Sequence, residues 1–195
     1  MIFITLLWIL SLTARSLCVL LNVSIDDTLG DERNGNMITY SDSWKLGQNC
    51  SDCTAIVDPS QAYEHTWHDG TYLPVNLGGD GELRTASVSF NGAIPELVSF
   101  RVCVMNFLCP GTAVYVMCII THSDVSPDGN TDMVFLLDGA QVGTLEQPPT
   151  NDTTYFYNQT VFSQTGLAFG PHTIRIEVGH NDTKALILLD RIIYT

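Results

Sequence analysis

Apolar and polar residues alternate along the end of the chain, and this pattern constrains the fold more than any other feature. In the segment HTIRIEVG, the residues Ile174, Ile176 and Val178 alternate with polar ones. A period of two is typical of a strand with one buried and one exposed face. Residues 179–182 then supply turn residues, and residues 184–194 are almost wholly apolar. We therefore predict a hairpin whose second strand is central and packed on both faces.

One charged residue, Asp190, interrupts this apolar segment. Counting in steps of two places its side chain on the same face as Leu188 and Ile192. A carboxylate on a dry face has to be paired, hydrogen-bonded or bound to a cation. Asp190 is therefore a candidate functional residue.

Short segments with the same alternation recur along the chain, separated by clusters of Gly, Pro, Asn and Asp. Further strands are predicted at residues 22–26, 37–40, 85–90, 113–121, 132–137 and 154–162. Between two of them, Asp138-Gly139 is a two-residue hairpin signal. Past the first 21 residues, apolar residues nowhere recur at the three-and-four spacing of a helix. The pattern predicts an all-β fold, an antiparallel β-sandwich with jelly-roll topology.

Length and charge narrow the functional classes. The 195 residues are enough for one domain with a sizeable core. Eight basic residues stand against 21 acidic ones, and the formal charge of -13 is spread along the chain. Such a surface repels phosphate groups, which excludes nucleic acids and anionic membranes as expected partners. Calcium ions and neutral sugars suit it better.

Residues 1–21 have the pattern of a signal peptide, with an apolar core followed by small residues near a plausible cleavage point. An uncleaved membrane anchor remains the alternative, because the segment stays apolar up to Leu21. Five N-x-S/T sequons agree with the secretory route. They lie at Asn22, Asn49, Asn151, Asn158 and Asn181. We expect a secreted or cell-surface glycoprotein whose mature domain spans residues 22–195.

Cys50 and Cys53 form a C-x-x-C motif in a polar segment. In an oxidising compartment such a pair predicts a small local disulfide. A redox pair would require a helix N-terminus beside the first cysteine, and a zinc site would require two further ligands nearby. Neither requirement is met by the local sequence.

Several stretches together resemble a family of secreted or membrane-anchored proteins of mushroom-forming fungi, the agaricomycetes. The stretches cover most of residues 22–195 in order: NVSIDDTLGD, SWKLGQNCSDC, DPSQAYEHTWHDGT, TAVYVMCII, FLLDG, HTIRIEVG and LLDRIIYT. The resemblance implies a domain similar to the galactose-binding-like jelly roll and a place outside the cell. No biochemical role is defined for that family, so the resemblance implies fold and location more than activity.

This chain departs from the family pattern at two places. An atypical insertion, AIPELVSFRVCVMNFLCPG, falls at about residues 92–110, and it is either a retained intron or a genuine hairpin closed by Cys103 and Cys109. In the family, a second domain copy, a Ser/Thr-rich linker and a transmembrane helix often follow, whereas this chain ends at the last predicted strand. The expectation is a short, free or truncated form, with membrane attachment only through an anchor outside this chain or an uncleaved leader.

A calcium site is the first functional hypothesis. In jelly-roll carbohydrate-binding modules, calcium commonly sits where acidic residues near the first strand meet a carboxylate of the last strand. Asp26, Asp27 and Asp190 resemble that arrangement, and Asp31 is a further candidate. Calcium prefers six to eight oxygen ligands, which carboxylates and carbonyls supply. The alternative is that these carboxylates only accept hydrogen bonds from the backbone.

A sugar platform is the second hypothesis. Pyranose rings stack on flat aromatic faces, and polar neighbours hydrogen-bond their hydroxyl groups. Trp44, Trp67 and Tyr72 lie in predicted loops, and His68 and Asp69 stand between the last two. The alternative reading makes Trp67 a buried core residue with satisfied neighbours.

Catalysis and transition-metal binding are the remaining hypotheses. His65, His68 and Asp69 would form a metal site only on a helix, which the β pattern opposes. Glu64 and Asp69 are an imaginable glycosidase pair, but no spacing supports it. The sequence thus predicts a non-catalytic module that binds glycan or cell-wall carbohydrate. A structural or adhesion protein that contacts other proteins is the alternative, and a carbohydrate-active hydrolase is the third possibility.

Overall fold

A computed structural model describes residues 21–92 and 112–195. Residues 1–20 of the predicted leader and nearly all of the predicted insertion, with Cys103 and Cys109, lie outside these ranges. Strands and short 3-10 helices make up the regular structure of the described residues, and no helix among them is long and apolar enough to cross a membrane. The prediction of an all-β chain is confirmed.

Twelve strands are present in the described ranges. In chain order they are β1 (Val23–Asp26), β2 (Gly30–Asp31), β3 (Thr39–Tyr40), β4 (Lys45–Leu46), β5 (His68–Asp69), β6 (Arg84–Gly92), β7 (Thr112–Ser123), β8 (Thr131–Leu137), β9 (Ala140–Gln147), β10 (Asn151–Leu167), β11 (Gly170–Val178) and β12 (Leu188–Tyr194). The 3-10 helices are η1 (Gly47–Asn49), η2 (Pro59–Gln61), η3 (Tyr63–His65) and η4 (Val75–Leu77).

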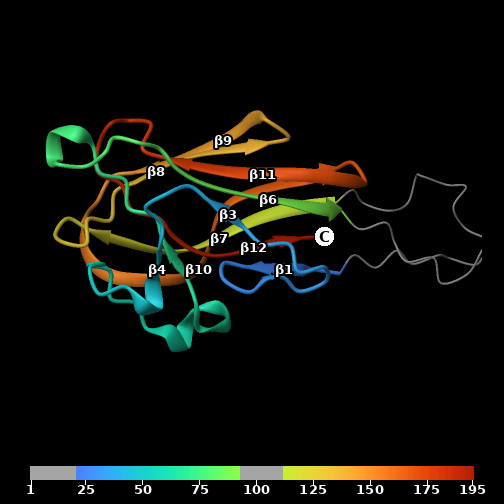
Figure 1. Cartoon of the computed structure of the whole chain (residues 1–195), viewed down its shortest axis with the longest axis horizontal. Helices are drawn as coiled ribbons and strands as arrows, with labels where there is room; N and C mark the ends of the chain where they lie inside the picture. Colours follow the sequence, from blue (N-terminus) through green and yellow to red (C-terminus); the bar gives the residue numbers. More distant parts are fainter. Residues whose placement is uncertain (1–20, 93–111) are drawn as a thin grey trace, which may run out of the picture.

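The strands form two antiparallel sheets that lie one above the other (Figure 1). The first sheet has the order β10-β7-β12-β1-β2, and β5 extends it beside β12 and carries β4. The second sheet has the order β3-β6-β11-β8-β9. Neighbouring strands within a sheet are mostly not consecutive in sequence, as expected of a jelly roll and not of a simple meander. The predicted β-sandwich is therefore confirmed.

The main core lies between the two sheets. Ile174, Ile176 and Val178 of β11 are fully buried, as their alternation predicts. They face inward residues of the first sheet such as Val116 and Ile192. Burial of each such side chain contributes about 1.5–3 kcal/mol, so this layer supplies most of the favourable free energy of folding.

The hairpin predicted at residues 138–139 is present. Leu137 pairs with Ala140, and the two turn residues Asp138 and Gly139 have φ values of 53° and 81°. Two consecutive positive φ values are those of a type I′ turn, whose twist matches the flanking strands. This turn connects β8 to β9, which forms one edge of the second sheet.

The prediction that the last two strands form a hairpin is wrong. β11 pairs with β6 and β8 in the second sheet, whereas β12 pairs with β1, β5 and β7 in the first. Residues 179–187 cross from one sheet to the other. Both strands are strongly apolar because each occupies the middle of its own sheet, and neither local pattern nor turn residues reveal this crossing.

The face predicted for Asp190 is also wrong. Leu189 pairs with Cys118 and Arg191 with Met117, so Asp190 is an extra residue in a β-bulge. A bulge shifts the alternation by one residue. Leu188 consequently points to the outer face of the first sheet, while Ile192 points to the core between the sheets. Asp190 belongs to the bulge and to neither row.

A second, smaller hydrophobic cluster covers the outer face of the first sheet. It contains Ile119 and Leu188 from the sheet, and Val57, Ala62 and Trp67 from the segment between β4 and β5. This segment, with η1 to η3, lies below the first sheet in Figure 1. The prediction that the last strand is packed on both faces is confirmed, because the covering segment buries its second face.

Candidate functional site

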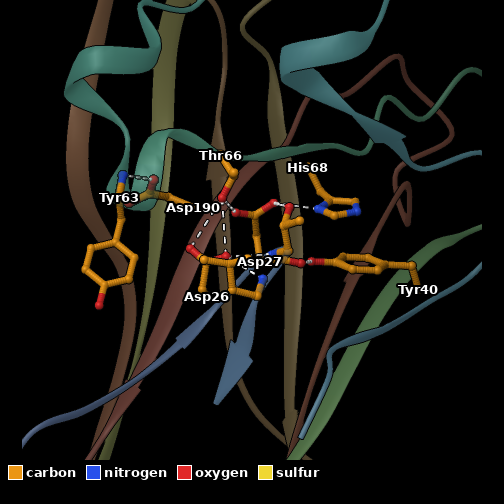
Figure 2. A network of polar contacts seen from close by, with 9 residues as sticks. Asp26, Asp27, Tyr40, Tyr63, Thr66, His68 and Asp190 are labelled. Carbon is orange, nitrogen blue, oxygen red and sulfur yellow. Dashed lines mark hydrogen bonds and ion pairs between the residues drawn. The ribbon is translucent and has the colours of Figure 1, made fainter. Parts of the chain in front are cut away.

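Three aspartates meet where the first and last strands run side by side. Asp26 ends β1, Asp27 follows it in the turn, and Asp190 in β12 lies beside them (Figure 2). The hydroxyl of Thr66 donates to Oδ1 of Asp27 at 2.6 Å and lies 3.3 Å from both carboxylate oxygens of Asp26. The backbone N–H of Tyr63 donates to Asp190 at 2.8 Å. The sequence prediction that these three aspartates share one place is supported.

His68 and Tyr40 close one side of this carboxylate cluster. Nδ1 of His68 lies 2.6 Å from Oδ2 of Asp27, and the hydroxyl of Tyr40 donates to the backbone carbonyl of Asp27 at 2.8 Å. The two rings stack with centroids 4.1 Å apart. The side chain of His68 is only 12% exposed. His68 thus positions Asp27, and little of its ring is left to contact a ligand.

Burial dominates the electrostatics of the cluster. Desolvation raises the pKa of Asp26 above its ordinary value, although hydrogen bonds from the N–H groups of Thr28 and Leu29 oppose the shift. Desolvation also raises the pKa of Asp190 to about 6, and the neighbouring Asp26 and Asp27 carboxylates add to it. These two carboxyl groups therefore carry a free-energy cost when they are ionised.

The carboxylate oxygens of Asp26 and Asp27 already take part in hydrogen bonds. Oδ1 of Asp26 accepts the N–H groups of Thr28 and Leu29, and Oδ2 of Asp27 accepts the hydroxyl of Thr28 and faces His68. In the described ranges, no three His, Cys, Asp or Glu residues converge as a metal-binding group. A calcium ion would have to displace several of these hydrogen bonds, since it requires six to eight oxygen ligands.

Calcium binding remains a prediction with a simple measurement. If Asp26, Asp27 and Asp190 hold calcium, adding EGTA to the purified protein lowers the melting temperature by more than a degree or two, and excess calcium restores it. The Asp190→Asn variant serves as the control and should not respond. An unchanged melting temperature in the unmutated protein counts against calcium.

Asp31 serves a different purpose. Its Oδ2 accepts the hydroxyl of Tyr194 at 2.8 Å in a buried contact, and its Oδ1 accepts the N–H groups of Arg33 and Asn34. Burial, and after it the hydrogen bond to Asp31, raises the pKa of Tyr194 above its ordinary value. Asp31 therefore ties the turn after β1 to the last strand, and it is not part of the carboxylate cluster.

The prediction that Trp67 and Tyr72 present an exposed sugar platform is wrong. Trp67 is 3% exposed, and Tyr72 is 2% exposed. A Cβ atom at Gly47 would lie 1.8 Å from Nε1 of Trp67, and one at Gly179 would lie 2.2 Å from the Tyr72 ring. The Trp67 ring therefore packs directly on the backbone at Gly47, and the Tyr72 ring on the backbone at Gly179. The alternative reading of Trp67 as a core residue describes it correctly, because the ring covers the outer face of the first sheet.

The other predicted platform residues are also committed to internal contacts. Asp69 is 4% exposed and accepts the N–H and hydroxyl of Thr71 at 3.1 and 2.8 Å. Trp44 is half-buried, packs against the Tyr40 ring with centroids 5.0 Å apart and lies close to Gly70. With His68 held by Asp27, the five predicted residues are neighbours in the fold, but they form no open platform.

The residues proposed for catalysis and for transition-metal binding do not come together in this segment. Glu64 and His65 lie exposed on η3 with φ values of 47° and 65°, whereas Asp69 is buried. Nδ1 of His65 lies 3.0 Å from the carbonyl of Pro59, and His68 is committed to Asp27. The imagined carboxylate pair does not face a shared cleft, so no glycosidase geometry exists here.

The predicted disulfide between Cys50 and Cys53 is present. It closes a short loop after η1, beside the segment that carries Trp67. Two tyrosines of β10 hold the same segment from the other side: the hydroxyls of Tyr155 and Tyr157 accept the N–H groups of Ile56 and Asp58 at 3.0 and 2.8 Å. The two tyrosines thus fasten the covering segment to β10, whereas the disulfide closes a loop within the segment.

All five sequon asparagines lie on the surface. Asn158 lies within the register shift between Phe156 and Gln159 of β10 and has a φ of 54°, and its Oδ1 accepts a hydrogen bond from Arg191 at 2.8 Å. Their exposure agrees with glycosylation at Asn22, Asn49, Asn151, Asn158 and Asn181, and their modification remains a prediction.

A groove that the sequence did not reveal opens between β9 and β10, at the edge shared by the two sheets. Its cavity volume is about 270 Å³. Its apolar lining consists of Ile120, Leu145, Phe156 and Val161. Its polar lining consists of His122, Gln147, Gln159 and Thr160. Among these described lining residues there is no Asp, Glu, Lys or Arg, so the groove is both amphipathic and uncharged.

Local structure explains why the groove is open. β10 has register shifts between Phe156 and Gln159 and between Thr160 and Phe162, and such bulges bend a strand and re-aim its side chains. Ile120 and Leu145 on the neighbouring strands belong to the edge of the main core. The groove could not be predicted from the sequence. The one signal for it is that His122, near the end of β7, falls on the inward-facing side of the alternation.

No protein-family model matches the chain, and no curated protein matches it. Among solved structures, a family 35 carbohydrate-binding module from Clostridium thermocellum is 12% identical with a TM-score of 0.43, over 89% of this chain and 96% of that one.

Two enzymes show a similar level of likeness. The Paenibacillus cycloisomaltooligosaccharide glucanotransferase is 13% identical with a TM-score of 0.43, over 82% of this chain and 18% of that one. The exo-β-1,3-galactanase of Phanerochaete chrysosporium is 12% identical with a TM-score of 0.43, over 81% and 27%. The chain thus spans less than a third of either enzyme. Similarity at these values carries no functional argument, and the resemblance to proteins of mushroom-forming fungi stays a prediction.

Proposed function

We propose that this chain is a non-catalytic carbohydrate-binding module, secreted or held at the cell surface. The observation that carries the proposal is the groove between β9 and β10, in which the ring of Phe156 lies beside the polar side chains of His122 and Gln147. An aromatic ring with a few polar groups around it is the combination that sugar rings require. The Cys50–Cys53 disulfide agrees with an oxidising compartment.

Binding without catalysis follows from the lining of the groove. Glycoside hydrolysis requires two carboxyl groups that flank the scissile bond. The described lining residues include no carboxylate. The strongly acidic surface of the chain, with a formal charge of -13, further disfavours anionic ligands such as nucleic acids. A neutral glycan is therefore the proposed ligand.

A second groove, between β3 and β6, is the weaker candidate. Its cavity volume is about 260 Å³, and its lining is dominated by hydroxyl groups from Thr39, Ser87, Ser89 and Thr173. No aromatic residue is among the described residues that line it. Without a flat apolar face, a sugar ring gains little from entering it.

Glycan-array binding of the purified chain tests the proposal. We expect saturable binding to a neutral glycan and a loss of at least about tenfold in affinity, equal to about 1.4 kcal/mol, in Phe156→Ala and in Gln147→Ala. Gln141→Ala is the matched control for Gln147→Ala, because Gln141 lies on the same strand, β9, and is exposed outside the groove. It should bind as the unmutated chain does.

The outcome also separates the alternatives. An array without any saturable signal rejects glycan binding and favours the structural or adhesion protein. Binding that survives both groove variants places the ligand elsewhere. Release of reducing sugar from the bound glycan would show a hydrolase and contradict the non-catalytic proposal.

A further inference from the structure

The side chain of His172, near the start of β11, joins two turns at one end of the sandwich. Its Nδ1 atom lies 2.7 Å from Oδ2 of Asp138, in the turn between β8 and β9. Its Nε2 atom lies 2.9 Å from the backbone carbonyl of Ala168, in the turn between β10 and β11. The ring packs against Phe90 of β6 with centroids 5.7 Å apart, and the side chain is only 12% exposed. His172 thus contacts three other elements of the fold.

Both ring nitrogens of His172 face atoms that only accept hydrogen bonds. A backbone carbonyl and an ionised carboxylate have no proton to donate, whereas a neutral imidazole carries a proton on one nitrogen alone. The imidazolium form donates to both partners at once. Neutral His172 would leave a nitrogen lone pair facing an oxygen lone pair, which is repulsive. The geometry therefore favours the charged form of the ring.

Asp138 supplies the counter-charge. The hydrogen bond from His172 holds the pKa of Asp138 below its ordinary value, so the group is an ionised acceptor. Burial opposes the charge on His172, but the hydrogen bonds to Ala168 and Asp138 outweigh burial and raise the pKa of the histidine. The β10–β11 turn contributes only a carbonyl, and β6 contributes the uncharged ring of Phe90. Among the described residues, Asp138 is therefore the charged group that acts on His172.

We propose that His172 is a pH-sensitive clamp, which as the imidazolium joins the β8–β9 turn to the β10–β11 turn and releases the β10–β11 turn when it loses its proton. The hydrogen bond to Ala168 is the one lost, because the remaining N–H bonds more strongly to the charged carboxylate of Asp138. Asp138 stays in place through Thr173, since the N–H of each residue also donates to the other, at 2.9 and 2.8 Å.

The two turns adjoin β9 and β10, the strands on either side of the groove. The clamp therefore holds one end of both strands together. The inference goes beyond the proposed function and does not depend on what the groove binds.

The direction of the pH effect follows from the raised pKa. The unfolded chain releases the histidine proton near the ordinary pKa of 6.5, whereas the folded chain keeps the proton to a higher pH. The stabilisation by the clamp is therefore complete well below pH 6.5 and is lost as the pH rises through the folded-state pKa of His172.

Long-range 1H–15N NMR of histidine-labelled protein tests the protonation state, because it reports whether each ring nitrogen carries a proton. The signals of His172 are assigned by their absence from the spectrum of His172→Phe. We expect both nitrogens of His172 to be protonated in the folded chain, with a titration midpoint above the ordinary 6.5. A midpoint at or below 6.5 would overturn the clamp.

Hydrogen exchange at pH 6 and pH 9, corrected for the intrinsic pH dependence of exchange, tests the release of the turn. In the unmutated chain, the amides of residues 167–170 should exchange at least about threefold faster at pH 9, the order of magnitude expected for the loss of one hydrogen bond. In His172→Phe, which keeps a ring against Phe90 but has no ring nitrogen, they should exchange fast at both pH values.

His180→Phe is the matched control, because the side chain of His180 is 36% exposed and has its Nε2 atom 3.0 Å from Glu177, away from both turns. This variant should retain the pH dependence of the unmutated chain. If His172→Phe does not fold, the exchange of the unmutated chain and of His180→Phe decides the question. Exchange of residues 167–170 that is equally slow at both pH values would overturn the clamp, even if the ring proves to be charged.

Discussion

Replacing Trp67 with alanine is expected to lower the free energy of unfolding by about 3–5 kcal/mol, the usual cost of removing a large buried aromatic ring. The ring is 3% exposed and packs with Val57, Ala62 and Leu188 on the outer face of the first sheet. Its removal leaves a cavity under a segment that cannot easily collapse, because hydrogen bonds to Tyr155 and Tyr157 of β10 and to Asp190 of β12 hold it. Denaturant unfolding followed by circular dichroism measures the effect.

Two variants make this prediction selective. Trp67→Phe retains part of the ring volume and should lose clearly less stability than Trp67→Ala. Phe156→Ala, in the groove, should lose glycan affinity with a much smaller effect on stability, since Phe156 is only half-buried. A Trp67→Ala protein that is as stable as the unmutated chain but no longer binds glycan would restore the platform hypothesis.

The second large effect concerns Asp190 and pH. Burial raises the pKa of Asp190 from 3.8 to about 6 in the folded state. Between these values the folded state binds a proton that the unfolded chain has released, so stability rises as the pH falls from about 6 to about 4. Above pH 6 the ionised carboxylate destabilises the fold. Desolvation shifts the pKa of Asp26 in the same direction.

Asp190→Asn should therefore stabilise the protein at pH 7 and flatten the pH dependence between 4 and 6. The shift of about two pKa units corresponds to nearly 3 kcal/mol, of which we expect about 1–2 kcal/mol to be recovered because the buried asparagine amide also carries a desolvation cost. The amide can still accept the N–H of Tyr63. Melting curves from pH 4 to 8 measure both effects.

The direction of the stability change in Asp190→Asn distinguishes two states of the site. A lower stability of Asp190→Asn at pH 7 would mean that a cation balances the carboxylate charge, which is the calcium prediction. Repeating the melts with calcium and with EGTA then separates a bound ion from an uncompensated carboxylate. The neighbouring Asp27 is not a useful target, because its contacts with Thr66 and His68 are structural.

Particular strands show why so much of the fold could be predicted. β6 and β11 each follow the alternation of their residues, because an inward side chain at every second position is a local consequence of strand geometry. The turn at Asp138-Gly139 was predictable for the same reason, since positive φ values are a property of those two residues. Proximity of Cys50 and Cys53 along the chain made their disulfide predictable as well.

The candidate sites were predictable only in part. The meeting of Asp26, Asp27 and Asp190 was expected, but whether their oxygens are free depends on donors such as Thr66 and the N–H of Tyr63. The groove joins His122, Gln147 and Phe156 from three strands, and nothing local marks them as neighbours. The burial of Trp67 did have a signal in the sequence. In a sandwich, a last strand that is apolar on both faces requires another segment to cover its outer face, and Trp67 belongs to that segment.

The amino-acid sequence by itself determined the strand periodicity, the turns, the acidic charge and the local disulfide, because each depends on residues that are adjacent or nearly so. Tertiary structure alone decided that β11 and β12 lie in different sheets, that the bulge at Asp190 reverses the parity of the last strand, and that Trp67 is buried. These outcomes depend on which distant segments compete to cover each apolar face. The packing of the whole domain decides which segment covers which face, so this cannot be predicted from a short stretch of sequence.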